Sequence, residues 1–459
     1  MNTQKKYLKW YNKVGYGMGD WGYMMVYGTI ISFIMLYLTD YVGLDSGIIG
    51  ILILASKLLD GITDIIFGNI IDRTHTKMGK ARPWMFWSAI GNAILMVALF
   101  SVPAMGETAQ YAYFFIAYTL LNAIFCTINN IAYSALTSLI TKNKNERVQL
   151  GTIRFLFSTV TGTALTYLTV WLVPVLGGGA AGWRNLAIIY GLISLAINTV
   201  SVFAVRELPE EELEDLEEGA VRENVSLLES VKLLLTNKYF VFLLIVYSVA
   251  FAQDSTVLGM GIYFVRDVLG NENLLGTFSM TNAVPIVLTL SSTPFLVKRF
   301  GMYKTNLVAM IVGLAGRIAM VFVQGTGNIP LLLFCSCIAW AGVGPMFGMI
   351  QALIAETSEY TYRTKKKRID GSMYSCSSLG SKLGNGIGTA VCGMLLSMGG
   401  YEGAAAVQSA QSMGMIKFIF LGLPIIEMAV MCFASFFLRV EEANEAWDAS
   451  NGAAAVEKK

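Results

Sequence analysis

Long apolar runs separated by short polar stretches dominate the chain, and this pattern restricts it to folds that a lipid bilayer accepts. Twelve runs of about 20 residues or more can be marked, enough for one transmembrane helix each. They cover 15–39, 46–71, 84–104, 111–140, 150–176, 183–205, 239–265, 275–297, 305–324, 329–355, 371–397 and 414–438. The runs are continuous and do not alternate with a period of two, which argues against a β-barrel. We therefore predict an all-α integral membrane protein with twelve transmembrane helices.

Composition excludes several other classes of protein. The chain is 55% hydrophobic and only 14% charged, whereas soluble domains have about 25% charged residues. Its net charge is +2 and no basic stripe is present, so nucleic acid is not expected as a partner. The sequence has no P-loop, GxSxG, HExxH or CxxC motif. We expect neither an enzyme nor a protein with a cofactor, and the six cysteines are expected to be reduced packing residues.

The basic residues sort strongly by side of the predicted membrane. Of the 33 Lys and Arg, 26 lie in the N-terminal segment, alternate connections, the central connection and the tail. The opposite connections hold only Arg184 and Arg266. Because positive charge stays on the cytoplasmic side, this split predicts a multi-pass protein of the cell membrane with both termini in the cytoplasm. Five basic residues remain inside the apolar runs: Lys57, Arg154, Arg317, Lys382 and Lys417.

An acidic connection divides the runs into six and six. Residues 206–238 contain the stretch ELPEEELEDLEEGAVRE, which is best interpreted as a solvated linker. The predicted parts are a six-helix bundle over 1–205, a cytoplasmic loop over 206–238, a second bundle over 239–440 and a tail over 441–459. A basic turn with glycine follows the second run of each half, at 68–80 and at 298–304. This repeated turn predicts two pseudo-symmetric bundles that derive from a duplicated unit.

Charged groups inside a membrane are costly, so each is a candidate functional residue. Asp60, Asn130 and Lys382 lie 13, 12 and 14 residues from the nearest predicted cytoplasmic basic residue. At 1.5 Å per residue they are about 18 to 21 Å deep, near the bilayer midplane. Transporters hold substrate and coupling ion at this depth.

Asp60 and Asp64 are four residues apart, which places both carboxylates on one helix face. Two close carboxylates in a low dielectric stay ionised only with a cation between them, or one becomes protonated. Together with a hydroxyl they would suit a hard monovalent cation. The alternative is a structural charge pair between Lys57 and Asp60. The one histidine, His75, lies in a predicted loop and offers no proton relay at this depth.

Three other charged residues within the predicted spans are candidates for the site. Lys382 lies among small residues and is expected to meet the Asp60 and Asp64 pair. Arg154 either extends to the membrane surface or reaches inward. Asp20 lies beside Trp21 on a glycine-rich face, and a carboxylate with an aromatic ring suits a sugar.

Arg317 and Glu427 share a depth, being 13 and 12 residues from Lys304 and Arg439. We expect them to form a structural ion pair.

The carboxylate pair and Lys382 lie within distinctive longer stretches. These are 37–40, 60–64, 72–84, 130–136, 146–154, 355–360 and 381–384. Together they resemble the glycoside–pentoside–hexuronide:cation symporters of the major facilitator superfamily, of which melibiose permease is the best-known type. The resemblance runs from Lys13 to the end of the last predicted helix. It implies the major facilitator fold, with alternating access around a central sugar site.

The resemblance assigns a cation site to the first half. Asp60 and Asp64 match the family's cation-binding carboxylates, and Thr127 matches a hydroxyl ligand. Sodium is expected as the coupling cation. Thr63 stands where the family has an asparagine, and this difference leaves proton and lithium open.

The resemblance also assigns the sugar site. Asn130, Arg154 and Lys382 match positions near sugar and cation. Phe347, Ser377 and Ser378 fall where the second half contributes to the cavity. The galactoside-binding aspartate of the melibiose type is replaced by Met24, with Asp20 one turn earlier.

The predicted function is symport of a sugar or glycoside with a monovalent cation across the lipid bilayer, by a monomer. Proton-coupled symport, uniport of a sugar or hexuronide, and a non-transporting membrane sensor are the alternatives. Ion pairs on the cytoplasmic side would latch one state. The residues expected to form them are Asp72, Arg73, Glu356, Glu359 and Arg363.

Overall fold

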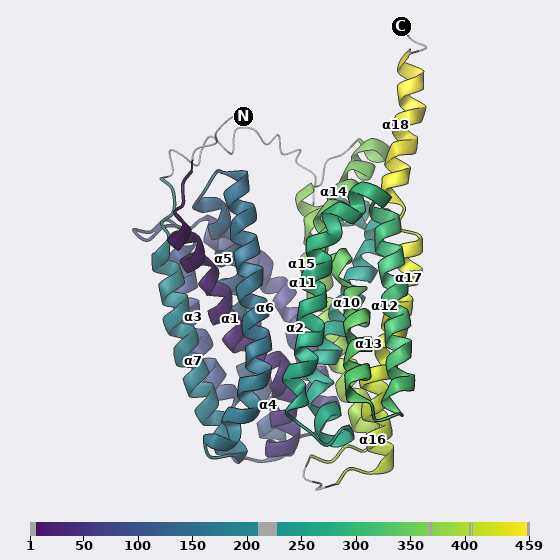
Figure 1. Ribbon diagram of the computed structural model, residues 1–459. Helices are drawn as coiled ribbons and strands as arrows, with labels where there is room; N and C mark the ends of the chain where they lie inside the picture. The colour runs from purple at the N-terminus through teal and green to yellow at the C-terminus, as the bar shows by residue number, and fades with distance from the viewer. Residues whose placement is uncertain (1–5, 210–226, 367–369, 404, 406, 457–459) are drawn as a thin grey trace. The chain divides into compact units, whose positions relative to one another are not determined.

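The computed structural model describes residues 6–209, 227–366, 370–403, 405 and 407–456. The side chains of the predicted site residues Asp72, Ser377 and Ser378 lie outside this description. Most of the acidic stretch in the central connection also lies outside it. The described elements are helices, joined by short turns (Figure 1).

Over residues 6–209 the chain forms seven α-helices and two π-helical segments. They are α1 (Trp10–Leu36), η1 (Tyr37–Val42), α2 (Ser46–Asp72), α3 (Arg82–Leu99), α4 (Glu107–Thr119), η2 (Leu120–Cys126), α5 (Thr127–Leu139), α6 (Lys144–Val175) and α7 (Gly179–Ala204). The π-helical segments continue the α-helix before them, so α4, η2 and α5 run on as one span.

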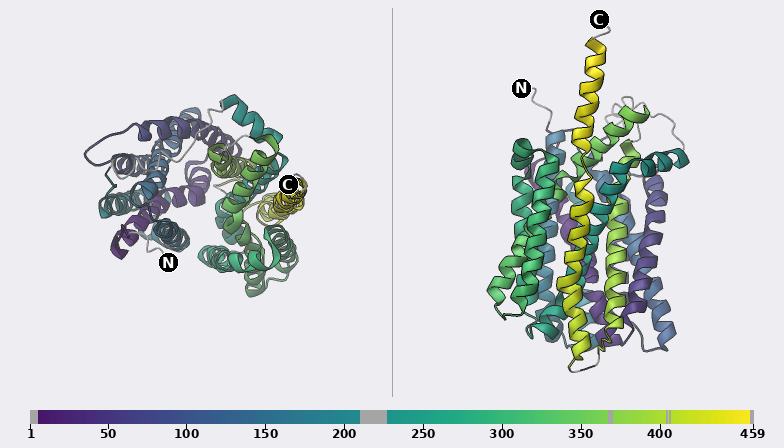
Figure 2. Two further views of the ribbon diagram at one scale, coloured as in Figure 1. Left: turned by 90° about the horizontal axis from the view of Figure 1, so that it is seen from above. Right: turned by 90° about the vertical axis from the view of Figure 1, so that its right-hand side faces the viewer.

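The second half repeats this use of π-helical segments. Its elements are α9 (Leu227–Thr236), α10 (Lys238–Tyr263), η3 (Phe264–Val268), α11 (Leu274–Phe300), α12 (Met302–Gln324), α13 (Ile329–Ala341), α14 (Gly344–Lys365), α15 (Asp370–Met398), α16 (Ala410–Lys417), η4 (Phe418–Gly422), α17 (Leu423–Phe436) and α18 (Val440–Val456). In Figures 1 and 2, α18 continues from α17 and projects past the ends of its neighbours α12 and α14.

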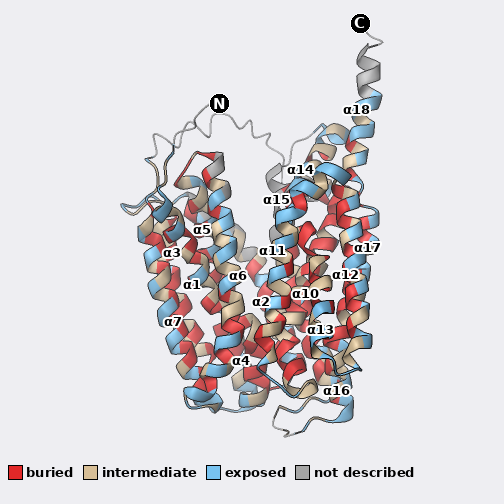
Figure 3. Cartoon of the chain, in the orientation of Figure 1, coloured by how far each residue is buried: buried red, intermediate tan, exposed pale blue. Residues whose placement is uncertain are grey.

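The predicted membrane spans all appear as helices. Within the described residues, nine helical stretches are long and apolar enough to cross a membrane. The other three predicted spans correspond to α2, α3 and α15, with 27, 18 and 29 residues. Exposed positions recur along α7 and α12 (Figure 3), and they include large apolar side chains such as Leu192 and Phe322. Apolar exposure along whole helices suits a lipid environment.

The chain divides into two compact units. One contains 1–220, 258–276 and 389–416, and the other contains 221–257, 277–388 and 417–459. The first unit thus includes short segments from the second half of the sequence. The division into bundles over 1–205 and 239–440 stays a prediction.

Glycines let α1 lie very close to its neighbours in the first unit. A Cβ at Gly19 would be 2.8 Å from the Tyr133 ring and from Ser201 Oγ. The Tyr133 hydroxyl donates to the Tyr16 carbonyl at 2.6 Å, and the Tyr16 hydroxyl donates back to the Tyr133 carbonyl at 2.9 Å. Small residues permit such close helix contacts. The glycine-rich face of α1 is therefore fixed against α5 and α7.

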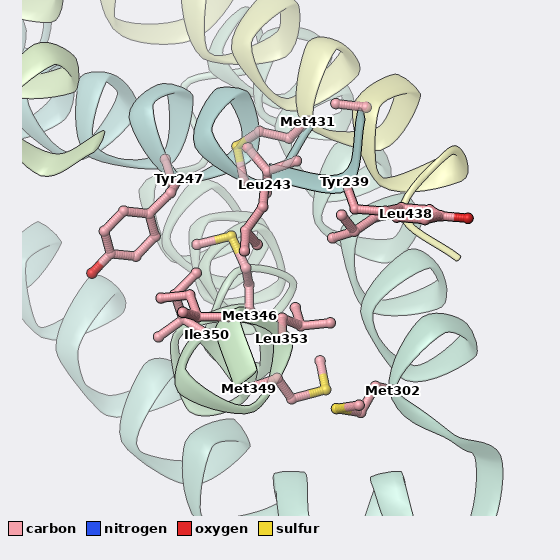
Figure 4. Close-up of a cluster of buried hydrophobic side chains, with 14 of the residues drawn as sticks. Tyr239, Leu243, Tyr247, Met302, Met346, Met349, Ile350, Leu353, Met431 and Leu438 are labelled. Atoms are coloured by element: carbon pink, nitrogen blue, oxygen red, sulfur yellow. The ribbon is translucent and has the colours of Figure 1, made fainter. Parts of the chain in front are cut away.

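Methionine side chains fill much of the core of the second unit. Met346 and Met349 on α14 pack with Met302 on α12 and Met431 on α17 (Figure 4). Their flexible thioethers fit irregular space between helices. This packing holds α14, which carries three predicted latch residues.

The predicted internal repeat has a counterpart in the backbone of each unit. Gly79 and Gly301 have φ of +112° and +78°, a conformation that favours glycine. Beside Gly79, the Glu207 carboxylate accepts the backbone N–H groups of Lys80, Ala81 and Arg82 at the start of α3, at 2.7 to 3.0 Å. A carboxylate at a helix N-terminus is stabilising.

The second unit repeats this arrangement at the start of α12. A Cβ at Gly301 would lie 3.3 Å from Glu441 Oε2, which accepts the Met302 N–H at 3.0 Å. Glu207 and Glu441 both follow the last span of their half. The shared arrangement supports a duplicated unit.

Glu146 at the start of α6 holds the N-terminal segment. It accepts the backbone N–H groups of Tyr7 and Leu8 at 3.2 Å and the Thr141 hydroxyl at 2.7 Å, and Lys13 Nζ lies 3.2 Å away. Burial raises the pKa of Glu146, but these hydrogen bonds lower it more, so the pKa is below its ordinary value of 4.5.

The lowered pKa of Glu146 predicts a pH dependence of stability. The native state binds this proton less tightly than the unfolded state, so the stabilisation is present above pH 4.5 and is lost as pH falls through the native pKa. Glu146→Gln should lower the unfolding temperature in detergent at pH 7 and weaken the acid dependence. Glu272→Gln, at an exposed carboxylate, is the control. Equal acid profiles for the two variants and the wild type would contradict this role.

Candidate cation and sugar site

The carboxylate pair of α2 lies where this helix meets η2 and α5. Asp60 is 5% exposed, and Asp64 is partly exposed one turn further on. The Thr127 hydroxyl donates to Asp60 Oδ1. The Thr63 hydroxyl donates to the Ala123 carbonyl at 2.5 Å and also lies 3.0 Å from the Asp60 carbonyl. The structure thus brings Asp60, Thr63 and Thr127 together from distant parts of the sequence.

The donor set of this site consists of oxygen atoms. Among the described residues, no three His, Cys, Asp or Glu side chains gather as a metal site. A cation here would depend on two carboxylates and on threonine hydroxyls, which are hard ligands. Such a set suits an alkali cation or a proton better than a transition metal.

The π-helical segment η2 shapes this site and was not expected from the sequence, which predicts one regular helix over 111–140. Thr127 follows η2 directly, and its hydroxyl lies 3.1 Å from the Asn122 carbonyl, five residues earlier. A single turn of π-helix often marks a functional position. One hydroxyl proton serves one acceptor at a time. Thr127 therefore has two alternative acceptors, the Asp60 carboxylate and the Asn122 carbonyl.

Within the described residues, Lys57 forms its hydrogen bonds with neutral oxygens and not with Asp60. It is 6% exposed, and its ammonium donates to Asn122 Oδ1 at 2.5 Å and to the Tyr27 hydroxyl at 3.4 Å. The ammonium also lies 5.0 Å from the centre of the Tyr27 ring. Because neutral oxygens satisfy this lysine, the carboxylate oxygens of α2 are left to other partners.

Arg154 reaches inward from α6 and pairs with Asp20 of α1. Its Nε lies 2.6 Å from Asp20 Oδ2 and its Nη2 lies 3.4 Å from Oδ1. The guanidinium stacks 3.9 Å from the centre of the Tyr133 ring. Beside the pair, Trp21 stacks on Phe157 with ring centres 6.0 Å apart. The sequence left two orientations open for Arg154, and the structure has the inward one.

The other predicted sugar residues occupy different surroundings. Asn130 is exposed on α5, one turn before Tyr133. Met24 turns its methyl group toward Gly28 and Gly162, between α1 and α6. Phe347 packs edge-to-face on Phe251 in the second unit.

Lys382 also belongs to the second unit, on α15, and is partly exposed. Its meeting with Asp60 and Asp64 stays a prediction.

Three predicted latch residues gather on α14 in the second unit with residues of α18 that the sequence did not single out. Arg363 contacts Glu359 at 3.0 Å, Asp448 at 2.9 Å and the Asn444 carbonyl at 2.7 Å. Asn444 in turn donates to Glu356 Oε2 at 2.7 Å. The C-terminal helix α18 is therefore part of this charged cluster. Arg73 is exposed in the first unit.

A second charged cluster was missed by sequence reasoning. Arg266 of η3 lies 2.6 Å from Asp40 of η1 and 2.7 Å from Asp267. The Tyr401 hydroxyl joins Arg266 at 2.5 Å and Asp40 at 3.0 Å. Asp40 also accepts the Thr39 hydroxyl at 2.7 Å. The sequence places Asp40 at the end of an apolar run, but Arg266 and Tyr401 lie more than 200 residues away and leave no local signal.

The expected ion pair between Arg317 and Glu427 does not form in the described structure. The guanidinium lies 4.7 Å from the centre of the Trp340 ring, and its Nε and Nη2 have no hydrogen-bond partner. Glu427 Oε1 accepts the Thr256 hydroxyl at 3.2 Å instead, and Oε2 has no partner. Depth along two helices does not fix the rotation of each helix, so a shared depth was insufficient evidence for a pair.

Comparison with known proteins places this chain in a family. Residues 15–442 match the family described as MFS/sugar transport protein. The isoprimeverose transporter of Lactiplantibacillus pentosus is 28% identical over 442 residues, covering 95% of this chain and 90% of that protein. The inner membrane symporter YicJ of Escherichia coli (strain K12) is 27% identical, covering 90% and 88%. The glucuronide carrier protein homolog of the same organism is 26% identical, covering 87% and 86%.

Solved structures share the fold at low sequence identity. The nucleoside transporter NupG superposes with a TM-score of 0.60 at 14% identity, covering 93% of this chain and 99% of that one. A bacterial homologue of the human lysosomal transporter Spinster superposes with a TM-score of 0.63 at 13% identity, covering 95% and 96%. These likenesses confirm the predicted fold class. The chain is a membrane protein that belongs to the sugar transport family of the major facilitator superfamily, in agreement with its resemblance to the glycoside–pentoside–hexuronide:cation symporters.

Proposed function

We propose that this protein couples sugar or glycoside uptake to a monovalent cation, with sodium as the coupling ion. The observation that carries the proposal is the pairing of the buried Asp60 with Thr127, one helical turn from a second carboxylate, Asp64. Uncoupled passage of a sugar needs no such group. Membership of a sugar transport family and similarity to proteins named as symporters support the same function.

The two carboxylates of α2 suit a monovalent cation. Asp60 and Asp64 lie one turn apart on one face of this helix, and two carboxylates that close repel each other in a low dielectric. Asp20 and Arg154 neutralise each other at 2.6 Å. A cation held by both Asp60 and Asp64 would relieve the repulsion between them.

Cation binding would change the hydrogen bonds around Asp60. When the ion takes the carboxylate oxygen, the Thr127 hydroxyl can turn its proton to the Asn122 carbonyl and present its lone pairs to the ion. The side chain of Asn122 holds Lys57, so this residue links the lysine to the cation site. The bound cation would then raise sugar affinity, and sugar would raise cation affinity by the same factor.

We assign sugar contacts to the Asp20 and Arg154 pair and to Asn130 in the first unit. Met24, Phe347, Ser377, Ser378 and Lys382 complete the proposed set. Alternating access would expose this site to one side of the cell membrane at a time. Asp72 and Arg73 would meet the latch cluster of Glu356, Glu359 and Arg363 in one of the two states. Both termini are assigned to the cytoplasm by the positive-inside pattern.

The test is uptake of a labelled glycoside panel into proteoliposomes, with sodium and pH gradients imposed separately. Symport predicts accumulation of one sugar above its external concentration when the sodium gradient is inward. Accumulation with the pH gradient alone would assign the coupling to protons. Equilibration without accumulation under either gradient would contradict symport and favour uniport.

A further inference from the structure

We propose that the ion pair between Asp20 and Arg154 makes the sugar site select uncharged glycosides over hexuronides. This inference rests on the proposed function, because it names the substrate class of the same site. The relatives alone do not decide between uncharged glycosides and hexuronides, since one is named an isoprimeverose transporter and another a glucuronide carrier homolog. The structure of the pair gives a physical reason for one of these classes.

The carboxylate of Asp20 occupies one edge of the Arg154 guanidinium. The Nε to Oδ2 distance is 2.6 Å, the Nη2 to Oδ1 distance is 3.4 Å, and the two side chains are 13% and 21% exposed. This two-point contact is the geometry in which arginine binds a carboxylate most strongly. Arg154 therefore already holds the kind of group that a hexuronide would bring.

The surrounding residues fix the pair in place. Tyr133, which is 1% exposed, supports the guanidinium from one face at 3.9 Å. Its hydroxyl bonds the backbone of Tyr16, one turn before Asp20. Gly19 brings α1 against this same ring. On the other side, Gly17 lies against Ile153 of α6 and Trp21 stacks on Phe157 of α6. Because these contacts hold α1 against both α5 and α6, Asp20 has little freedom to move away and release the arginine.

A sugar carboxylate at this position would meet two obstacles. It would have to share the guanidinium with Asp20, and it would lie beside a like charge that is mostly shielded from water. Like charges placed together in an interface repel and so exclude the wrong partner. A neutral hydroxyl meets neither obstacle, since it can accept from a free guanidinium N–H or donate to an Asp20 oxygen. The pair therefore suits hydroxyl-bearing, uncharged rings.

The experiment compares ligands that differ only at C6 of the sugar. Purified full-length protein with saturating sodium is titrated with p-nitrophenyl β-D-glucopyranoside and its glucuronide, and with the matching galactoside and galacturonide. Affinity is measured by ligand-induced thermal shift, which does not require transport. The wild type should bind the neutral member of a pair about tenfold or more tightly. Asp20→Asn should move this ratio about tenfold toward the uronide, because Arg154 gains a vacant edge.

Two further variants separate this effect from a general change of charge. The double variant Asp20→Asn with Arg154→Gln should gain no uronide affinity, because no cation remains there. Asp45→Asn removes a carboxylate at the start of α2 and should keep the wild-type ratio.

This inference alone would be overturned if the wild type bound both members of each sugar pair equally well. It would also be overturned if Asp20→Asn left the ratio of neutral-sugar to uronide affinity unchanged. Binding of none of the four sugars by the wild type would contradict the proposed function as well. The wild-type ratio needs no variant, so the inference stays testable if Asp20→Asn does not fold.

Discussion

Asp60→Asn is expected to abolish sodium-driven sugar accumulation while leaving exchange of sugar across the membrane. The variant keeps the size of the side chain and a group that can bond Thr127, but it removes the charge that attracts the cation. Coupling free energies of 1 to 3 kcal/mol correspond to about 5- to 150-fold in affinity. We therefore expect the stimulation of sugar binding by sodium to fall from this range to none. The measurement is uptake in proteoliposomes with and without an inward sodium gradient.

The matched control for this variant is Asp45→Asn, which changes the same residue type near the start of the same helix. Asp45 Oδ1 accepts the Ile48 N–H at 3.0 Å, and this residue lies 15 positions before Asp60, about 22 Å away along the helix. This control should accumulate sugar as the wild type does. Retained exchange in Asp60→Asn shows that the variant is folded. Undiminished accumulation by Asp60→Asn would remove Asp60 from the cation site.

Arg266→Gln is expected to destabilise the first unit more than Arg184→Gln does. These two are the basic residues of the connections on the side opposite the predicted cytoplasmic one. Removing the guanidinium leaves the Asp40 and Asp267 carboxylates, which are 8% and 13% exposed, without their cation. Breaking a buried ion pair by removing one partner typically costs about 3 to 5 kcal/mol. The cluster joins segments from both halves of the sequence, so the loss should appear as a clearly lower unfolding temperature in detergent.

A double-mutant cycle tests the origin of this effect. Asp40→Asn combined with Arg266→Gln should cost less than the two single changes added together, because the unpaired carboxylate is gone. Arg184→Gln changes the other basic residue of the opposite connections, which is exposed, and should have little effect. If Arg184→Gln and Arg266→Gln lowered the unfolding temperature equally, the cluster would not have the stabilising role assigned to it.

The features that the sequence predicts well are those with a local physical cause. The spans follow from runs of apolar residues, because the bilayer requires about 20 of them. Asp60 and Asp64 share a face because of their spacing, which a helix converts directly into proximity. The turns at Gly79 and Gly301 form a repeat that the sequence shows, and both glycines have a positive φ in the structure.

The features that the sequence did not predict depend on distant partners or on irregular backbone. Nothing in the run 111–140 signals a π-helical segment, since it has neither proline nor glycine. Glu207 closes the turn at Gly79 from 128 residues away in sequence. The partner of Arg154 was undecided because its depth allowed two directions, and tertiary packing of α6 against α1, which carries Asp20, selects one of them. Arg317 shows the opposite failure, where matching depth suggested an ion pair with Glu427 that the described structure does not contain.

The most direct test of coupled transport is reciprocity of binding in one purified preparation. The dissociation constant of the transported sugar is measured by calorimetry with and without the cation that drives its uptake, and that of the cation with and without the sugar. Symport through the Asp60 site predicts that each ligand tightens the other by the same factor, and that Asp60→Asn removes this effect. A sugar affinity that is independent of the cation in the wild-type protein would contradict the account.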